Sequence, residues 1–185
     1  YFCRKSTNRF VREGTTKKLN PNERVILNKN YFSITPKIIW RQTAAYPIAT
    51  LDERGIWFGR SIQAAIFRKG KGEEYSYKYI LVLFNSNYLR YLYIQDVKET
   101  GRVFPQVKLS KLASLPVRKI SLDAQQPFTD LVDQILAITK DEDYLANPTK
   151  QAKVKEYERQ IDQMVYHLYD LTPEEIAIVE GFNKK

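Results

Sequence analysis

Basic, aromatic and amide side chains alternate along two short stretches of this 185-residue chain. Together they offer what a protein needs to hold a nucleic-acid duplex. Lysine and arginine neutralise phosphates and release counterions, which gives an affinity that falls with salt. Arginine can bind guanine and glutamine can bind adenine along the major-groove edge, while hydroxyl groups position the backbone. These residues are Lys37, Trp40, Arg41, Gln42, Thr43, Tyr46, Arg54, Trp57, Arg60, Ser61 and Gln63.

The first stretch has the composition of a β-strand, so its side chains should point alternately to the two faces of a sheet. On a strand that begins near Lys37, Arg41 and Thr43 share one face, and Trp40 and Gln42 share the other. We predict that Arg41 and Thr43 face the DNA and that Trp40 packs inside, although the opposite parity stays open. Trp57 is also predicted to lie in the core, because large aromatic side chains are mostly buried.

Further elements must position these groups. Strands are predicted at residues 36–40, 61–68, 103–109 and 116–120, and a hairpin is predicted to join residues 46–51 and 55–58 through a loop at 52–55. Two helices are predicted at residues 79–84 and 88–92, split at 85–87, although the tyrosines and isoleucine of these segments also favour strand. A helical turn is predicted at 110–114. A longer amphipathic helix is predicted to start at Asp123 as its N-cap.

The C-terminal part has the clearest helical pattern. Apolar residues from Val154 to Tyr169 recur at three- and four-residue steps, which places them on one face of a long helix. Thr172 then predicts an N-cap, with Pro173 at the first helical position and Glu175 closing a capping box. Gly181 is predicted to end this last helix in the left-handed conformation.

Charge divides the chain in two. Residues 1–120 hold 23 Lys and Arg against 8 Asp and Glu, whereas residues 121–185 hold 7 against 13, within a net charge of +9. A basic body joined to an acidic helical end is typical of a polyanion-binding domain with a structural appendage. We therefore predict an α+β fold with a small mixed or antiparallel sheet and short helices. Its body spans residues 1–120, and a helical hairpin with a short terminal helix (residues 121–185) braces it within one compact unit.

The composition excludes several classes of protein. One cysteine and one histidine cannot form an internal disulfide or a Cys/His zinc site. No run of about 18 apolar residues is long enough to span a membrane. The chain opens without methionine or a signal-peptide pattern, so we interpret it as a fragment of a longer protein and expect a reducing cytoplasmic location.

Three segments resemble one protein family. They are residues 36–43 (Pro-Lys-Ile-Ile-Trp-Arg-Gln-Thr), residues 102–116 from Arg102 to Pro116, and the helical residues 158–175, which include Val-Tyr-His-Leu-Tyr-Asp-Leu-Thr-Pro-Glu-Glu. In this order they resemble the TaqI-like C-terminal specificity domain of adenine-specific DNA methyltransferases and type IIG restriction-modification enzymes. The resemblance spans residues 36–181, and residues 1–35 match it least.

The resemblance implies a target recognition domain that faces a bacterial methyltransferase domain across double-stranded DNA. The methyltransferase domain would lie upstream in the same polypeptide and would bind S-adenosylmethionine; a fused endonuclease stays open. This fragment would bind no cofactor itself. The DNA-contacting residues would be Lys37, Arg41, Gln42, Thr43, Arg54, Arg60, Ser61, Lys69, Lys71, Arg102 and Lys108. Basic residues before position 20 carry only a general phosphate-contact hypothesis.

The usual catalytic patterns are not found in the sequence. Asn147-Pro148 lacks the second proline and the aromatic residue of an adenine-binding turn, so it predicts only a turn between helices. Gly70-Lys71-Gly72 is too short for a methyl-donor loop. Asp96-Val97-Lys98 lacks the partner acid of a nuclease, and His167 is predicted to be a partly exposed helical residue. No catalytic residue is assigned within this fragment.

Three alternatives fit the same charge. The aromatic content of 13% also suits an RNA-binding or single-stranded nucleic-acid-binding module. A fragment of a type I restriction specificity subunit would place the same DNA contacts in a separate subunit, although only one recognition unit fits here. A protein-interaction domain would use the basic face for an acidic partner.

Overall fold

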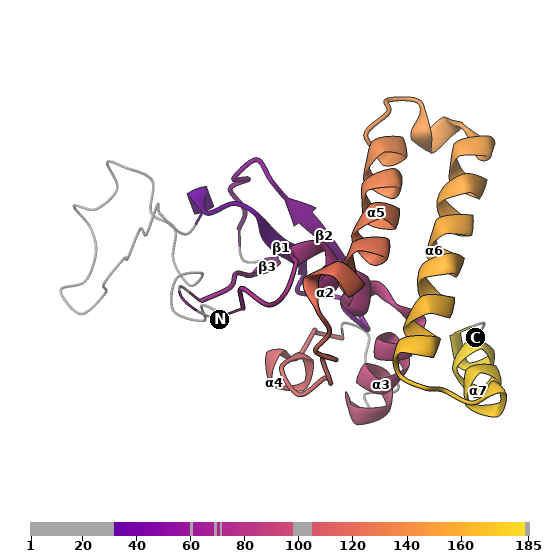
Figure 1. Ribbon diagram of the computed structural model, residues 1–185. Helices are drawn as coiled ribbons and strands as arrows, with labels where there is room; N and C mark the ends of the chain where they lie inside the picture. Colours follow the sequence, from indigo (N-terminus) through magenta and orange to yellow (C-terminus); the bar gives the residue numbers. More distant parts are fainter. Residues whose placement is uncertain (1–31, 60, 69, 71, 98–104, 184–185) are drawn as a thin grey trace, which may run out of the picture.

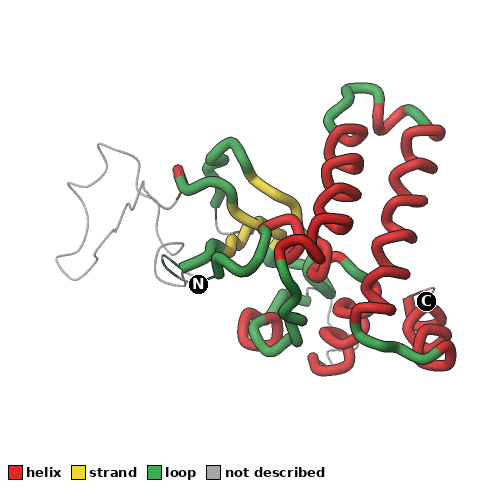
Figure 2. Tube along the Cα trace, in the orientation of Figure 1, coloured by secondary structure: helices red, strands yellow, loops and turns green. Residues whose placement is uncertain are grey.

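The computed structural model describes residues 32–59, 61–68, 70, 72–97 and 105–183. Within these residues the fold is α+β, as predicted, with one small antiparallel sheet and six α-helices. The strands lie at the centre of the molecule (Figure 2), and the helices extend from one side of them.

The sheet has three strands in the order β2-β1-β3: β1 (Lys37–Arg41), β2 (Ala49–Asp52) and β3 (Ile62–Ala65). Both neighbours run antiparallel to β1, and Ile39 lies opposite Thr50 and Ala64. The period of two gives β1 two different faces. Ile38 and Trp40 are buried on the inner face, whereas Lys37, Ile39 and Arg41 point to the other side, which we call the outer face.

Strand predictions held in part. Those at residues 36–40 and 61–68 are confirmed by β1 and β3, but the hairpin across residues 52–55 is wrong, because β2 pairs with β1. The carboxylate of Asp52 accepts hydrogen bonds from the backbone N–H groups of Arg54 and Ile56, so these N–H groups are not available to a strand partner. In the described part of 103–109, pairing is limited to a bridge between Gln106 and Thr43, and residues 116–120 form no strand.

Two predicted helices follow the sheet in sequence, and the first of them packs against it. They are α2 (Tyr77–Asn85) and α3 (Asn87–Val97), separated only by Ser86 as the sequence indicated. On the inner face, Trp40 meets the ring of Phe84 edge-on with 6.2 Å between centroids. The side chain of Asn85 donates to the carbonyl of Ala49 and accepts its N–H, both at 2.9 Å. This amide therefore supplies the hydrogen bonds that a fourth strand would give to the edge of β2.

The C-terminal helices form an upright hairpin beside the sheet (Figure 1). After the short α4 (Leu109–Leu112), α5 (Leu122–Thr139) and α6 (Pro148–Leu168) run antiparallel, joined through the 3-10 helix η2 (Tyr144–Ala146), and α7 (Pro173–Asn183) follows. The capping box is confirmed: Thr172 N–H donates to Glu175, and Glu175 N–H donates to the Thr172 hydroxyl.

Two helix-boundary predictions are wrong. Ser121, not Asp123, caps α5, because its hydroxyl accepts from Ala124 N–H. Gly181 lies inside α7 and does not have a positive φ angle, so it does not end the helix in the left-handed conformation. Ser121 and Asp123 both have side chains that can cap a helix, and a glycine can also lie inside a helix, so the local sequence did not define either boundary.

One hydrophobic core joins the sheet to the helices of both sequence halves. Trp40 from β1, Leu83 from α2, Phe128 from α5 and Val165 from α6 belong to the same buried cluster. Gln125 of α5 is buried with them and satisfies its amide on three backbone groups, those of Ser76, Glu74 and Ile120. The start of α5 is therefore tied to the start of α2.

A buried ion pair lies at one end of the outer face. Lys37 Nζ is 2.5 Å from Asp52 Oδ2, and both residues are about 1% exposed. The same ammonium donates to the carbonyl groups of Phe32 and Ile34 at 2.8 and 3.1 Å. The prediction that Lys37 contacts DNA is therefore wrong, because all its donors are used inside the protein.

Burial by itself would raise the pKa of the Asp52 carboxyl, but hydrogen bonds from Lys37, Arg54 and Ile56 outweigh burial and hold this pKa below its ordinary value of 3.8. The pair then stabilises the fold above that value and loses its effect as the pH falls through the lower, folded-state pKa.

Replacing Lys37 by methionine should destabilise the protein by about 3–5 kcal/mol, because Asp52 would stay buried without its counter-charge. Urea unfolding followed by circular dichroism measures this. Lys140→Met is the matched control, since Lys140 and Glu53 form an exposed pair at 3.9 Å and should contribute less than about 1 kcal/mol. Equal midpoints for the two variants would contradict this role of Lys37.

Asp162 of α6 holds the first turn of α3. Its carboxylate accepts the backbone N–H and the side-chain amide of Asn87, at 2.8 and 2.7 Å. Burial raises the pKa of Asp162 from 3.8 to about 6, and the nearby Glu158 and Glu180 add to this increase. Between these two values the folded state keeps a proton that the unfolded chain has released, so this group lowers stability as the pH rises.

Asp162→Asn should therefore remove a pH dependence. The free energy of unfolding of the natural chain, relative to the variant, should fall between about pH 4 and pH 6 and then stay level. Urea midpoints at four pH values across this range measure it. A difference that does not change with pH would contradict the raised pKa.

Candidate nucleic-acid interface

Predicted DNA-contacting residues from three distant segments meet at the end of β1. Gln42 N–H donates to the carbonyl of Ser61 at 2.8 Å, and Val107 N–H donates to the carbonyl of Gln42 at 2.8 Å. Thr43 forms a β-bridge with Gln106. The chain at Arg41, Gln42 and Thr43 therefore lies between Ser61 and Lys108, and we call these five residues the β1-end cluster.

The β1-end cluster offers polar groups to solvent. Arg41, Thr43 and Ser61 are exposed, and Gln42 and Lys108 are half-buried. Trp40, in contrast, is 2% exposed and donates its indole N–H to Gln63. The predicted parity of the strand is therefore confirmed as far as burial is concerned: Trp40 packs inside, and Arg41 and Thr43 point outward.

Helix α3 supports the β1-end cluster. Tyr93 of α3 accepts the backbone N–H of Lys108 at 2.8 Å. The guanidinium of Arg90, also from α3, lies 3.7 Å from the ring centroid of Tyr46, within the range of a cation–π interaction. Tyr46 belongs to the loop that follows Thr43, so this contact anchors the loop. The sequence carried no signal for Arg90, because only the fold brings α3 against residues 42–48.

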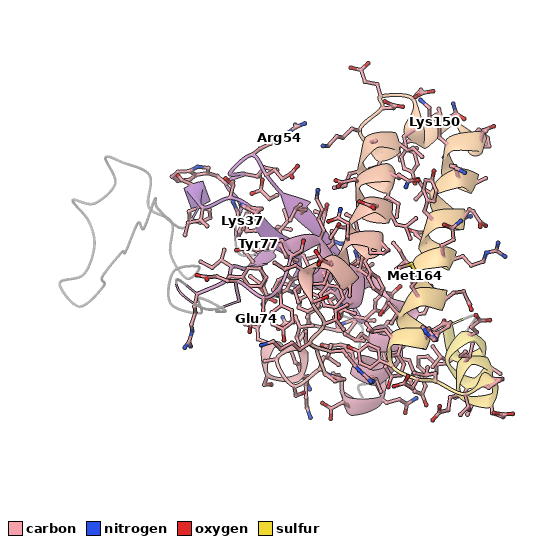
Figure 3. All side chains as sticks on the ribbon, in the orientation of Figure 1. Lys37, Arg54, Glu74, Tyr77, Lys150 and Met164 are labelled. Carbon is pink, nitrogen blue, oxygen red and sulfur yellow. The ribbon has the colours of Figure 1, made fainter. Side chains whose placement is uncertain are left out.

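Arg54 lies at the opposite end of the sheet, on the loop after β2, and points into solvent near the buried Lys37 (Figure 3). Trp57 on the same loop is 52% exposed, so the prediction that it lies in the core is wrong. It stacks on Phe32 instead, with 5.0 Å between ring centroids. The remaining predicted residues Arg60, Lys69, Lys71 and Arg102, and the basic residues before position 20, lie outside the described residues.

Most exposed cations elsewhere in the described residues are paired with acids. Arg41 and Arg54 have no ion-pair partner among these residues, which leaves both free for an anionic ligand. The paired groups are Lys78–Asp133, Lys111–Asp96, Arg118–Asp170, Lys119–Glu74, Lys140–Glu53, Lys150 with Asp141 and Asp143, and Arg159–Glu156.

The residues singled out for catalytic patterns have structural roles. Asn147 caps α6 by accepting Lys150 N–H, which confirms the predicted turn. Asp96 pairs with Lys111, and His167 is exposed on the last turn of α6. Within the described part of the chain no group of three or more His, Cys, Asp or Glu side chains is arranged to hold a metal.

Gly72 packs closely against an aromatic ring. A side chain at Gly72 would meet the ring of Phe67 at 2.8 Å, so this glycine is needed for close packing against an aromatic residue. Among the described residues, no helix combines the length and apolar character needed to cross a membrane.

Comparison with known proteins gives one family. The model of the TaqI-like C-terminal specificity domain matches residues 4–117, more than half of the chain. No curated protein matches the chain. The match includes the N-terminal residues that the sequence resemblance left unassigned and contains the whole β1-end cluster. It ends before α5, so the resemblance of residues 158–175 stays a prediction. The chain belongs to the family of TaqI-like C-terminal specificity domains, which give methyltransferase-type systems their DNA sequence specificity.

Proposed function

We propose that this chain recognises the target sequence of an adenine-specific DNA methyltransferase by contacting double-stranded DNA with the β1-end cluster. The methyltransferase domain would precede it in the same polypeptide, bind S-adenosylmethionine and carry out the chemistry. The system would be a bacterial restriction-modification system in the cytoplasm. The observation that supports this most is that Arg41, Gln42, Thr43, Ser61 and Lys108 meet within a domain of a specificity family.

Each side chain suits a separate part of the task. An exposed arginine without an acid partner can bind guanine in bidentate fashion or neutralise a phosphate. Gln42 has an amide that matches the adenine edge, and its backbone is held on both sides, which limits its movement. Thr43 and Ser61 offer hydroxyls for phosphate or base contacts. We further propose that the acidic helices from residue 121 onward act as a brace for this body, because α5 and α6 share its core.

Arg41→Ala should weaken binding to duplex DNA by about tenfold, because one charge-assisted contact is worth about 1–3 kcal/mol. A labelled pool of random-sequence 30-bp duplexes, titrated by fluorescence anisotropy at several salt concentrations, measures this. The slope of log affinity against log salt should also decrease by about one if Arg41 binds phosphate. If Arg41 instead contacts a base, the sequences that the natural chain selects from the pool should prefer one base at a given position. The sequences that the Arg41→Ala variant selects should lack this base preference.

Arg159→Ala is the matched control. This arginine is exposed on α6 and paired with Glu156, so its loss should leave both affinity and salt slope unchanged. Single-stranded DNA and RNA of the same length test the alternative nucleic-acid ligands. Stronger binding to either single strand, or equal binding by the Arg41 and Arg159 variants, would contradict the proposal.

A further inference from the structure

The loop after β2 exposes large apolar side chains beside an unpaired cation. Ile56 and Trp57 are 48% and 52% exposed, and Ile34, from the segment before β1, is 36% exposed. Arg54 lies three residues before Trp57 and has no ion-pair partner among the described residues. An exposed tryptophan next to an arginine is a combination that binding surfaces favour.

This loop is held in place from inside the protein. The Asp52 carboxylate accepts the backbone N–H groups of Arg54 and Ile56 at 2.9 and 2.8 Å. Trp57 stacks on Phe32 at an interplanar angle of 17°, and the carbonyl of Phe32 accepts from Lys37. Because backbone and indole are already ordered, a ligand that packs on them would cost little conformational entropy.

The loop and the β1-end cluster lie at opposite ends of the sheet. Lys37 and Arg41 lie on the same outer face of β1, four residues apart, which corresponds to about 13 Å along a strand. Since base pairs are about 3.4 Å apart, this separation equals roughly four base-pair steps. A duplex that lies along the outer face could touch Arg41 at one end and the loop held by Lys37 and Asp52 at the other.

We propose that residues 54–57 form a second DNA contact, in which Trp57 and Ile56 pack against the sugars or an opened base step of the duplex and Arg54 binds an adjacent phosphate. This inference rests on the proposed function, because the same duplex must occupy the β1-end cluster. Apolar side chains from DNA-binding proteins are known to wedge into duplexes in this way, and phosphate contacts from arginine fix the orientation. The free cation of Arg54 favours an anionic duplex over a protein surface as the occupant.

The two tryptophans of the chain make a direct test possible. Trp40 is buried and Trp57 is exposed, so acrylamide should quench mainly the fluorescence of Trp57. Saturating random-sequence duplex, with saturation checked by anisotropy of labelled DNA, should reduce the quenching constant of the natural chain at least about twofold. In Trp57→Phe, which keeps Trp40 alone, the constant should be low and should not change with DNA.

Affinity measurements complete the test. Trp57→Ala should lower duplex affinity about tenfold with the salt slope unchanged, because stacking is not ionic, whereas Arg54→Ala should reduce the slope by about one. Leu145→Ala is the matched control, since Leu145 is an exposed apolar residue on η2, and it should change neither quantity. Urea midpoints check that each variant is folded.

The outcomes separate this inference from the proposed function. Duplex binding that depends on Arg41 but leaves the quenching of Trp57 unchanged would overturn the second contact and leave the β1-end cluster in place. Protection of Trp57 in the chain joined to its upstream domain without DNA would also overturn it, in favour of a protein-docking surface. Failure to bind duplex at any salt concentration would overturn both.

Discussion

The ion pair between Lys37 and Asp52 is the interaction on which the exposed side of the sheet depends. Removing two charges from water is costly, and the cost is recovered only where further hydrogen bonds satisfy both groups. Here the ammonium binds two carbonyls besides the carboxylate, and the carboxylate binds two backbone N–H groups. One pair therefore orders the segment before β1 and the loop after β2 together.

The other end of β1 is ordered by different means. Backbone hydrogen bonds hold the chain there: Gln42 N–H donates to the carbonyl of Ser61, and the carbonyl of Gln42 accepts the N–H of Val107. Helix α3 supports these segments through Tyr93 and through Arg90 against Tyr46. The polar side chains that we assign to DNA are thus displayed on backbone held by the fold, which is the arrangement that precise recognition requires.

Charge is arranged to match this division. Several lysine and arginine residues on the helices, such as Lys111 and Arg159, are paired with acids and add little to the external field. Arg41 and Arg54, at the two ends of the sheet, are left without such partners among the described residues.

The helical half shows how far local patterns reach. Thr172 and Glu175 form the predicted capping box, and the split between α2 and α3 falls where Asn85, Ser86 and Asn87 indicated it. These signals depend on hydrogen bonds between residues that are close in sequence, so they can be predicted without knowledge of the tertiary structure. The burial of Trp40 and the exposure of Arg41 could also be predicted, because alternation is a property of the strand itself.

The sequence alone determined the fold class, the family resemblance and the residues Arg41, Gln42, Thr43, Ser61 and Lys108 as candidates. It did not determine which polar residues are used inside the protein. Lys37 and Asp52 are 15 positions apart and became partners only when β1 paired with β2, and this same pairing left Trp57 on an exposed loop. Pairing of strands and packing of α3 against residues 42–48 are long-range contacts, and long-range contacts leave no periodic trace in a local stretch of sequence.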